Sequence, residues 1–123
     1  MKVEGAMMGI PYFKNIEHGK VLALSSLVSY QEGQIVSRTL AQNSMVSITL
    51  FAFEKGEEIS SHVSDGDAMV TVLEGAACIT VGGEEHHLTQ GETIVMPEGI
   101  PHALYAEEQF KMHLTVVFPQ QVP

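Results

Sequence analysis

The chain has 123 residues, a length that suits one domain and is too short for two. Fifteen Asp and Glu against six Lys and Arg give a formal net charge of -9. A nucleic-acid partner is therefore not expected, because phosphate binding needs clustered cations. The single cysteine excludes an internal disulfide. Apolar stretches of about six residues are far shorter than a membrane span, and no secretory signal is visible, so we expect a cytoplasmic protein without a membrane partner.

Short apolar runs, separated by turn signals about every ten residues, are typical of all-β sandwiches and barrels. The expected strands are 21–24, 35–36, 46–53, 68–73, 76–81, 87–88, 93–96, 103–105 and 111–118. Gly82 and Gly83 predict a tight hairpin with positive φ angles. No long segment has helical periodicity. The sequence therefore predicts an all-β barrel with under about a tenth of its residues in helix.

Residues 1–20 are predicted to form an N-terminal arm, and residues 21–123 to form the barrel domain. The arm has a Met-rich start, and it either pairs with a partner subunit or frays. The run 46–53 is apolar on both parities, with Phe51 and Phe53 opposite in parity to Leu50. A lone barrel would leave one of these faces exposed. We therefore expect a homodimer that buries Phe51, Phe53 or both.

Two segments carry paired motifs. Residues 56–75 have the sequence GEEISSHVSDGDAMVTVLEG, which includes His62 and Ser64, and residues 91–103 have the sequence GETIVMPEGIPHA, which includes His102. With their internal spacings, the two segments resemble the two motifs of the cupin superfamily, in its small single-domain form. The resemblance covers about residues 45 to 118, and the earlier strands would complete the barrel. It implies a cupin jelly-roll barrel (a double-stranded β-helix), commonly a homodimer, with its site inside the barrel.

The departures from the cupin pattern concern metal ligands. Metal-binding cupins usually offer two His and one Glu from the first motif and one His from the second. His62 and His102 match, whereas Ser64 and Ala68 stand where the second His and the Glu would be, and Ala106 replaces a frequent Asn. Alternation would place His62, Ser64 and Ala68 on one inward strand face. The resemblance therefore implies either no metal or a weakly held divalent transition metal (Zn, Fe, Mn or Ni) on His62 and His102.

The barrel interior around the two His is expected to be mostly apolar. The inward side chains would be Val70, Val72, Ile94, Met96, Leu104, Met112, Leu114 and Val116. The expected ligand contacts are Ser64, Met96, Leu104, Met112 and Leu114. Such a lining suits a small ligand with a large apolar portion and one or two polar atoms. The alternatives are that these side chains fill the barrel, and that the two His form structural hydrogen bonds or an acid and base pair without metal.

Other polar side chains have structural interpretations. The carboxylates of segment 65–67 are expected in a solvated turn, unless a bulge turns one inward as a replacement ligand. His86 and His87 are expected to be exposed, and His113 to point away from the core, where it could lie at a subunit interface. Cys78 has no basic neighbour in sequence, so we expect an inert thiol.

Two classes of function remain. In the first, the barrel binds a small, largely apolar molecule, with at most a weak metal on two His. In the second, the protein is a metal-dependent enzyme: a dioxygenase acting on an aromatic or enol-like substrate, or an isomerase or decarboxylase of a small acid. Ser64 and Ala68 favour binding, because they remove two metal ligands. The resemblance also implies that His62 and His102 point into the same end of the barrel, so we expect their ring nitrogens to lie within about 3 to 5 Å.

Overall fold

The computed structural model describes residues 12–120. In this range, strands dominate and helix is limited to one short 3-10 turn. The elements are η2 (Leu24–Leu27), β1 (Ile35–Gln42), β2 (Val46–Phe53), β3 (Glu58–His62), β4 (Asp67–Val81), β5 (Glu84–Thr89), β6 (Thr93–Met96), β7 (His102–Tyr105) and β8 (Phe110–Val117). The predicted all-β class is confirmed. No helix among the described residues is long and apolar enough to cross a membrane.

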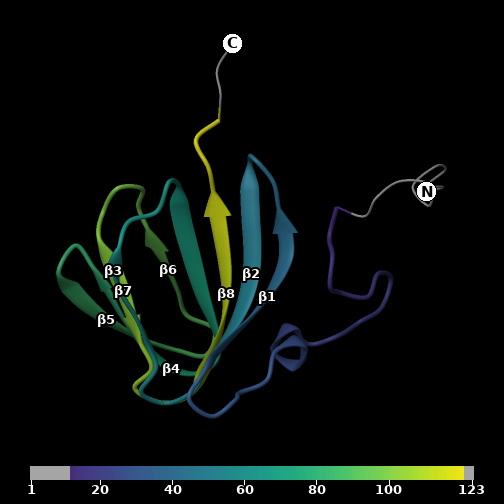
Figure 1. The fold of residues 1–123 in the computed structure, drawn as a ribbon, viewed down its shortest axis with the longest axis horizontal. Coiled ribbons are helices and arrows are strands. Elements are labelled where there is room, and N and C mark those ends of the chain that lie inside the picture. Colours follow the sequence, from purple (N-terminus) through teal and green to yellow (C-terminus); the bar gives the residue numbers. More distant parts are fainter. Residues whose placement is uncertain (1–11, 121–123) are drawn as a thin grey trace.

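The strands form two antiparallel sheets that share β4. The order is β1-β2-β8-β4-β6 in the first sheet and β5-β4-β7-β3 in the second. The part of β4 before Ala76 pairs with β8 and β6, and the part from Ala76 onward pairs with β5 and β7. Figure 1 shows β1, β2 and β8 on one side of a common interior and β3, β5 and β7 on the other. This is the expected jelly-roll barrel.

The strand β4 bends at Gly75, where the sequence predicted a turn between two strands. Gly75 has a φ of +82°, and a Cβ there would lie 2.0 Å from the carbonyl oxygen of Gln109. Only glycine adopts this conformation freely and allows so close a backbone approach. The strand continues through the bend, since Gly75 pairs with Phe110 and Ala76 pairs with Thr89. The expected break was wrong, because the glycine redirects the strand without ending it.

Other boundaries follow the sequence more closely. The expected strands 46–53 and 93–96 coincide with β2 and β6. The hairpin is confirmed, with φ of 58° at Gly82 and 84° at Gly83. The strand expected at 21–24 was wrong, because this segment runs into the turn η2. There the amide and hydroxyl of Ser26 both donate to the carbonyl of Ala23, which competes with extended pairing.

The inner core lies between the two sheets. Phe53 on β2 stacks on Phe110 on β8, with ring centroids 4.5 Å apart, and both side chains are fully buried. The inner core also contains five other large side chains that are almost fully buried: Val70, Val72, Ile79, Met96 and Met112. Phe53 therefore stabilises the barrel from within. The expected dimer interface at Phe53 was wrong, because the interior of the chain itself covers this side chain.

A second core covers the outer face of β2. Leu50 and Ala52 point away from the barrel and pack with Val28 and Leu40, under the segment that precedes β1. Both faces of β2 are thus buried within one chain, since alternate side chains enter opposite cores. The two apolar faces of this strand therefore do not require a homodimer. The homodimer itself stays a prediction, which light scattering at micromolar concentration would check.

The described part of the expected N-terminal arm lies against β1 of its own chain. The amide of Lys14 donates to the carbonyl of Leu40, and the Asn15 side chain donates to the carbonyl of Thr39. Arg38 donates in return to the carbonyl of Asn15. Residues 1–11 of the expected arm and residues 121–123 lie outside the described residues, and the boundary between arm and barrel at residue 20 stays a prediction.

His113 lies on the outer face of β8, away from the barrel interior as predicted. It lines a pocket of about 500 Å³ beneath the N-terminal segment, together with Phe13, Ile16 and Leu24 among others. Burial lowers the pKa of His113. Since the unfolded chain keeps the ordinary histidine pKa near 6.5, it binds more protons than the native state below that pH.

We therefore expect the free energy of unfolding to decrease as the pH falls below about 6.5, and His113→Gln to make this decrease shallower. His87 is a control of opposite sign, because its hydrogen bond with Glu107 raises its pKa. Removing His87 should change the slope with the opposite sign, mainly above pH 6.5, because the stabilisation that a raised pKa supplies is complete below 6.5 and is lost as the pH rises above it. Denaturant unfolding between neutral and mildly acidic pH measures both slopes, and an unchanged slope in His113→Gln would contradict the argument.

Candidate functional site

Two histidines meet where adjacent strands begin and end. β3 ends at His62, β7 begins at His102, and these residues are direct cross-strand partners. Their Nε2 atoms lie 3.1 Å apart, and their ring centroids lie 4.3 Å apart with an interplanar angle of 67°. His102 is buried, whereas His62 is exposed. The predicted convergence of the two rings is present, at the place where the barrel interior meets solvent.

Backbone carbonyls orient both rings. The Nδ1 atom of His62 lies 2.9 Å from the carbonyl oxygen of Ser60, and that of His102 lies 3.2 Å from the carbonyl oxygen of Ile100. Because a carbonyl oxygen only accepts, each Nδ1 carries a proton and donates it. In the neutral rings both Nε2 lone pairs then point at each other. Such a pair is favourable only with a cation between the nitrogens, either a proton or a metal ion.

The surroundings of His102 disfavour a proton on its Nε2 atom. Burial is the main cause that lowers the pKa of His102, and the charge of His62 lowers it further, while the hydrogen bond to Ile100 acts in the opposite direction. The Nε2 lone pair of His102 is therefore available near neutral pH. In metal sites, a ligating His commonly donates its other ring N–H to a carbonyl or carboxylate, as both rings do here.

The spacing of the two nitrogens fits a shared metal ion. With zinc to nitrogen distances of about 2.05 Å, two nitrogens 3.1 Å apart would both reach one ion. Protein ligands beyond this pair are lacking at the positions that the motif offers, since Ser64 Oγ donates to the carbonyl of Gly66 and Ala68 has no ligand atom. Water would complete the coordination, so the residues fit a weakly held ion.

Neither carboxylate of the neighbouring turn replaces the missing ligands. Asp65 and Asp67 are both exposed, and Asp67 Oδ1 accepts a hydrogen bond of 2.9 Å from the amide of Glu98. The alternative that a bulge turns one of them into the barrel was wrong. The solvated turn is confirmed, because both carboxylates are exposed and Asp67 bonds to the loop outside the barrel.

The two His lie at one end of an apolar pocket of about 180 Å³. Its lining consists of Phe51, Ile59, His62, Ser64, Ala68, Met96, His102, Leu104, Met112, Leu114 and Val116. All the site residues expected from the sequence are in this set: His62, His102, Ser64, Met96, Leu104, Met112 and Leu114. Val70 and Val72, which were also expected to face inward, are part of the packed core and not of this lining.

Sequence reasoning missed Phe51 and Ile59. Phe51 was assigned to a subunit interface, although its parity with Phe53 places both on the same face of β2. Ile59 lies on β3, which was not among the expected strands because its five residues are mostly polar and exposed. The predicted shared strand face of His62, Ser64 and Ala68 was also wrong: β3 ends at His62 and β4 begins at Asp67. The turn between these strands returns Ser64 and Ala68 to the same pocket.

Comparisons with known proteins agree with this architecture. Residues 49–118 match the family model of the cupin domain. A conserved protein of unknown function from Streptococcus pyogenes is 52% identical, with 91% of this chain and 98% of that chain covered and a TM-score of 0.88. A cupin superfamily protein from Desulfitobacterium hafniense is 32% identical, with 87% and 98% covered and a TM-score of 0.83.

A cupin 2 conserved barrel domain protein from Leptotrichia buccalis is 44% identical, with 76% of this chain and 46% of that chain covered and a TM-score of 0.75. No curated protein matches the sequence. The family model covers more than half of the chain. The chain therefore belongs to the cupin family.

Proposed function

We propose that this protein binds a small, largely apolar molecule inside its barrel, and that His62 and His102 hold the polar end of that molecule directly or through a divalent metal. One observation supports this above all. The two Nε2 atoms, 3.1 Å apart, form the polar end of a pocket whose other side chains are apolar apart from Ser64. A few placed polar groups in an apolar pocket are enough to orient a small ligand.

The pocket volume limits the size of the molecule. An apolar cavity of about 150 Å³ accommodates benzene, so a pocket of about 180 Å³ suits a single six-membered ring with one substituent. A sugar nucleotide does not suit this lining, because its hydroxyls and phosphates would lack partners. The proposed ligand class is therefore a single ring, or an aliphatic molecule of similar size, with one oxygen-containing head.

A metal would alter the chemistry of the head group. Zn, Fe, Mn or Ni on His62 and His102 would act as a Lewis acid toward an oxygen of the ligand. The chain's own residues orient the two nitrogens and exclude water from the apolar part of the pocket. Without metal, the same nitrogens would offer a hydrogen bond to the head group.

Binding of phenol and benzoate tests the proposal. We expect both to bind to the parent protein, and His102→Ala to weaken binding at least about tenfold, because the buried head group loses its partner. His86→Ala is the matched control and should bind like the parent. 2-Naphthol tests the size limit and should not bind. Isothermal titration and amide chemical shifts measure affinity and location, and equal affinity in His102→Ala and the parent would contradict the proposal.

The alternative is a metal-dependent enzyme, a dioxygenase or an isomerase or decarboxylase of a small acid. The distance of 3.1 Å between the two Nε2 atoms, which fits a shared metal ion, supports it. Metal analysis of protein purified without chelator or affinity resin tests the enzyme. One transition-metal ion per chain that stays bound through purification, and that is lost in the double variant H62A/H102A, would favour the enzyme, whereas the binding function needs at most a weakly held ion.

A further inference from the structure

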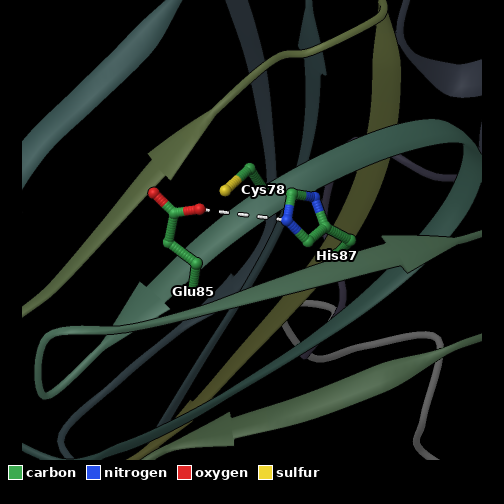
Figure 2. Close-up of side chains that lie close together, drawn as sticks. All are labelled: Cys78, Glu85 and His87. Carbon is green, nitrogen blue, oxygen red and sulfur yellow. Dashed lines mark ion pairs between the residues drawn. The ribbon is translucent and has the colours of Figure 1, made fainter.

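Outside the barrel, metal-binding side chains from neighbouring strands converge on one face of the second sheet. Cys78 on β4 lies between His87 on β5 and Tyr105 on β7, as their direct cross-strand partner. One ligand atom from each of Cys78, Glu85 and His87 lies within 4.8 Å of the others. Figure 2 shows the thiol, the carboxylate and the imidazole pointing toward one another.

Alternation along the strands puts this cluster on the outer face. The neighbours of Cys78 along β4, Ala77 and Ile79, are fully buried in the barrel core, so Cys78 points to the opposite side. Cys78 is 9% exposed, whereas His87 is exposed. The cluster is therefore separate from His62 and His102, which line the interior pocket.

A fourth side chain orients the imidazole. His87 Nδ1 lies 2.7 Å from Glu107 Oε1, and His87 Nε2 lies 3.9 Å from Glu85 Oε2 (Figure 2). Glu107 thus holds one ring nitrogen while the other faces the cluster. A carboxylate that accepts the second N–H of a ligating His is the common support of protein metal sites, since it fixes the tautomer and makes the ligand more basic.

The cluster borders a hollow that leaves room for a further ligand. Cys78 and Glu85 line a surface pocket of about 330 Å³, together with Thr80, Ser60 and Tyr105 among others. A cation bound between the thiol and the imidazole would therefore face an open space with hydroxyl groups around it. Water or an oxygen of a small anion can occupy the remaining position.

We propose that the outer face of the second sheet holds a site for a thiophilic divalent cation, zinc above all, with Cys78 Sγ, a Glu85 oxygen and His87 Nε2 as ligands. One sulfur, one nitrogen and one oxygen ligand suit zinc, and the thiolate disfavours magnesium and calcium. The interior pair offers two nitrogens, so the outer cluster has one more protein ligand. Binding converts the Cys78 thiol to a thiolate and releases its proton to solvent.

Cobalt replaces zinc as a visible probe for the test. Metal-free protein titrated with CoCl₂ at slightly alkaline pH should develop the near-ultraviolet charge-transfer absorption of a cobalt–thiolate bond. This absorption should saturate at one thiolate-bound ion per chain in the H62A/H102A background, and zinc should remove it. Cys78→Ser should abolish the band. His87→Ala should weaken binding at least about tenfold, and Glu107→Gln about 10-fold to 100-fold.

Two controls locate the ion. His86→Ala removes a histidine next to His87 whose side chain is on the other face of β5, and it should bind cobalt like the parent. The double variant H62A/H102A should keep the band, which separates this site from the interior pair. Glu85→Gln gives a second, nearly isosteric test at an exposed position, should Cys78→Ser fail to fold. The proposal is overturned if cobalt binds without the charge-transfer band, or if Cys78→Ser or Glu85→Gln binds it like the parent.

Discussion

Replacing Phe53 with Ala is expected to lower the free energy of unfolding by about 3 to 5 kcal/mol, the usual loss for a fully buried phenylalanine. Phe53 has no exposed surface, and it stacks on Phe110 between the two sheets. This loss is a large fraction of the total stability of a typical domain, which is about 5 to 15 kcal/mol. Urea unfolding followed by circular dichroism measures it.

Phe51→Ala is the matched control for this prediction. Phe51 has the same parity on β2, and its ring lies 6.1 Å from that of Phe53, but it is only partly buried and borders the pocket. Its replacement should cost less, because a pocket already adjoins the side chain. If Phe53→Ala lowered the free energy of unfolding only slightly, and if this loss increased on dilution of the protein, Phe53 would lie at a subunit interface and not in the interior.

Gly75→Ala is the second substitution with a large expected effect. A positive φ costs a residue with a Cβ about 1 to 2 kcal/mol. At Gly75 the new methyl would also lie 2.0 Å from the Gln109 oxygen and 2.7 Å from the Phe110 Cα, both of which are backbone atoms. Relief of this overlap requires the strands to move apart, which adds about 1 to 3 kcal/mol.

Gly91→Ala separates the two contributions. Gly91 has a φ of +87°, but nothing lies within 4 Å of the added Cβ. The variant should show the conformational cost alone. Thermal and urea unfolding of both variants give the comparison, and equal losses at Gly75 and Gly91 would show that the backbone contact of β4 with β8 does not limit the fold.

Strand boundaries could be predicted from the sequence where turn signals bound an apolar run. They could not be predicted where one residue changes the direction of the chain within a strand. β2 and β6 were predicted in full, because apolar runs bounded by turn signals define such strands. At Gly75 the same signal marks a bend inside β4, which only the tertiary pairing distinguishes from a turn. The burial of both faces of β2 also depends on tertiary structure. The barrel interior covers Phe53, and the segment before β1 covers Leu50 and Ala52, and the sequence shows neither contact.

The interior site could be predicted because its histidines lie in motifs with fixed spacing. The register of β3 with β7 makes His62 and His102 neighbours, although 40 positions separate them. The outer cluster carries no such motif. Cys78, His87 and Glu107 lie on different segments, and only the pairing of β4 with β5 and β7 brings them together.

The shared strand β4 has a consequence for cooperativity. Its first part is bonded on both sides within one sheet, and its second part is bonded on both sides within the other. Neither sheet can open while the other stays intact, since each would lose a central strand. The amide hydrogens of β4 should therefore exchange only through global unfolding, and the barrel behaves as one cooperative unit rather than two.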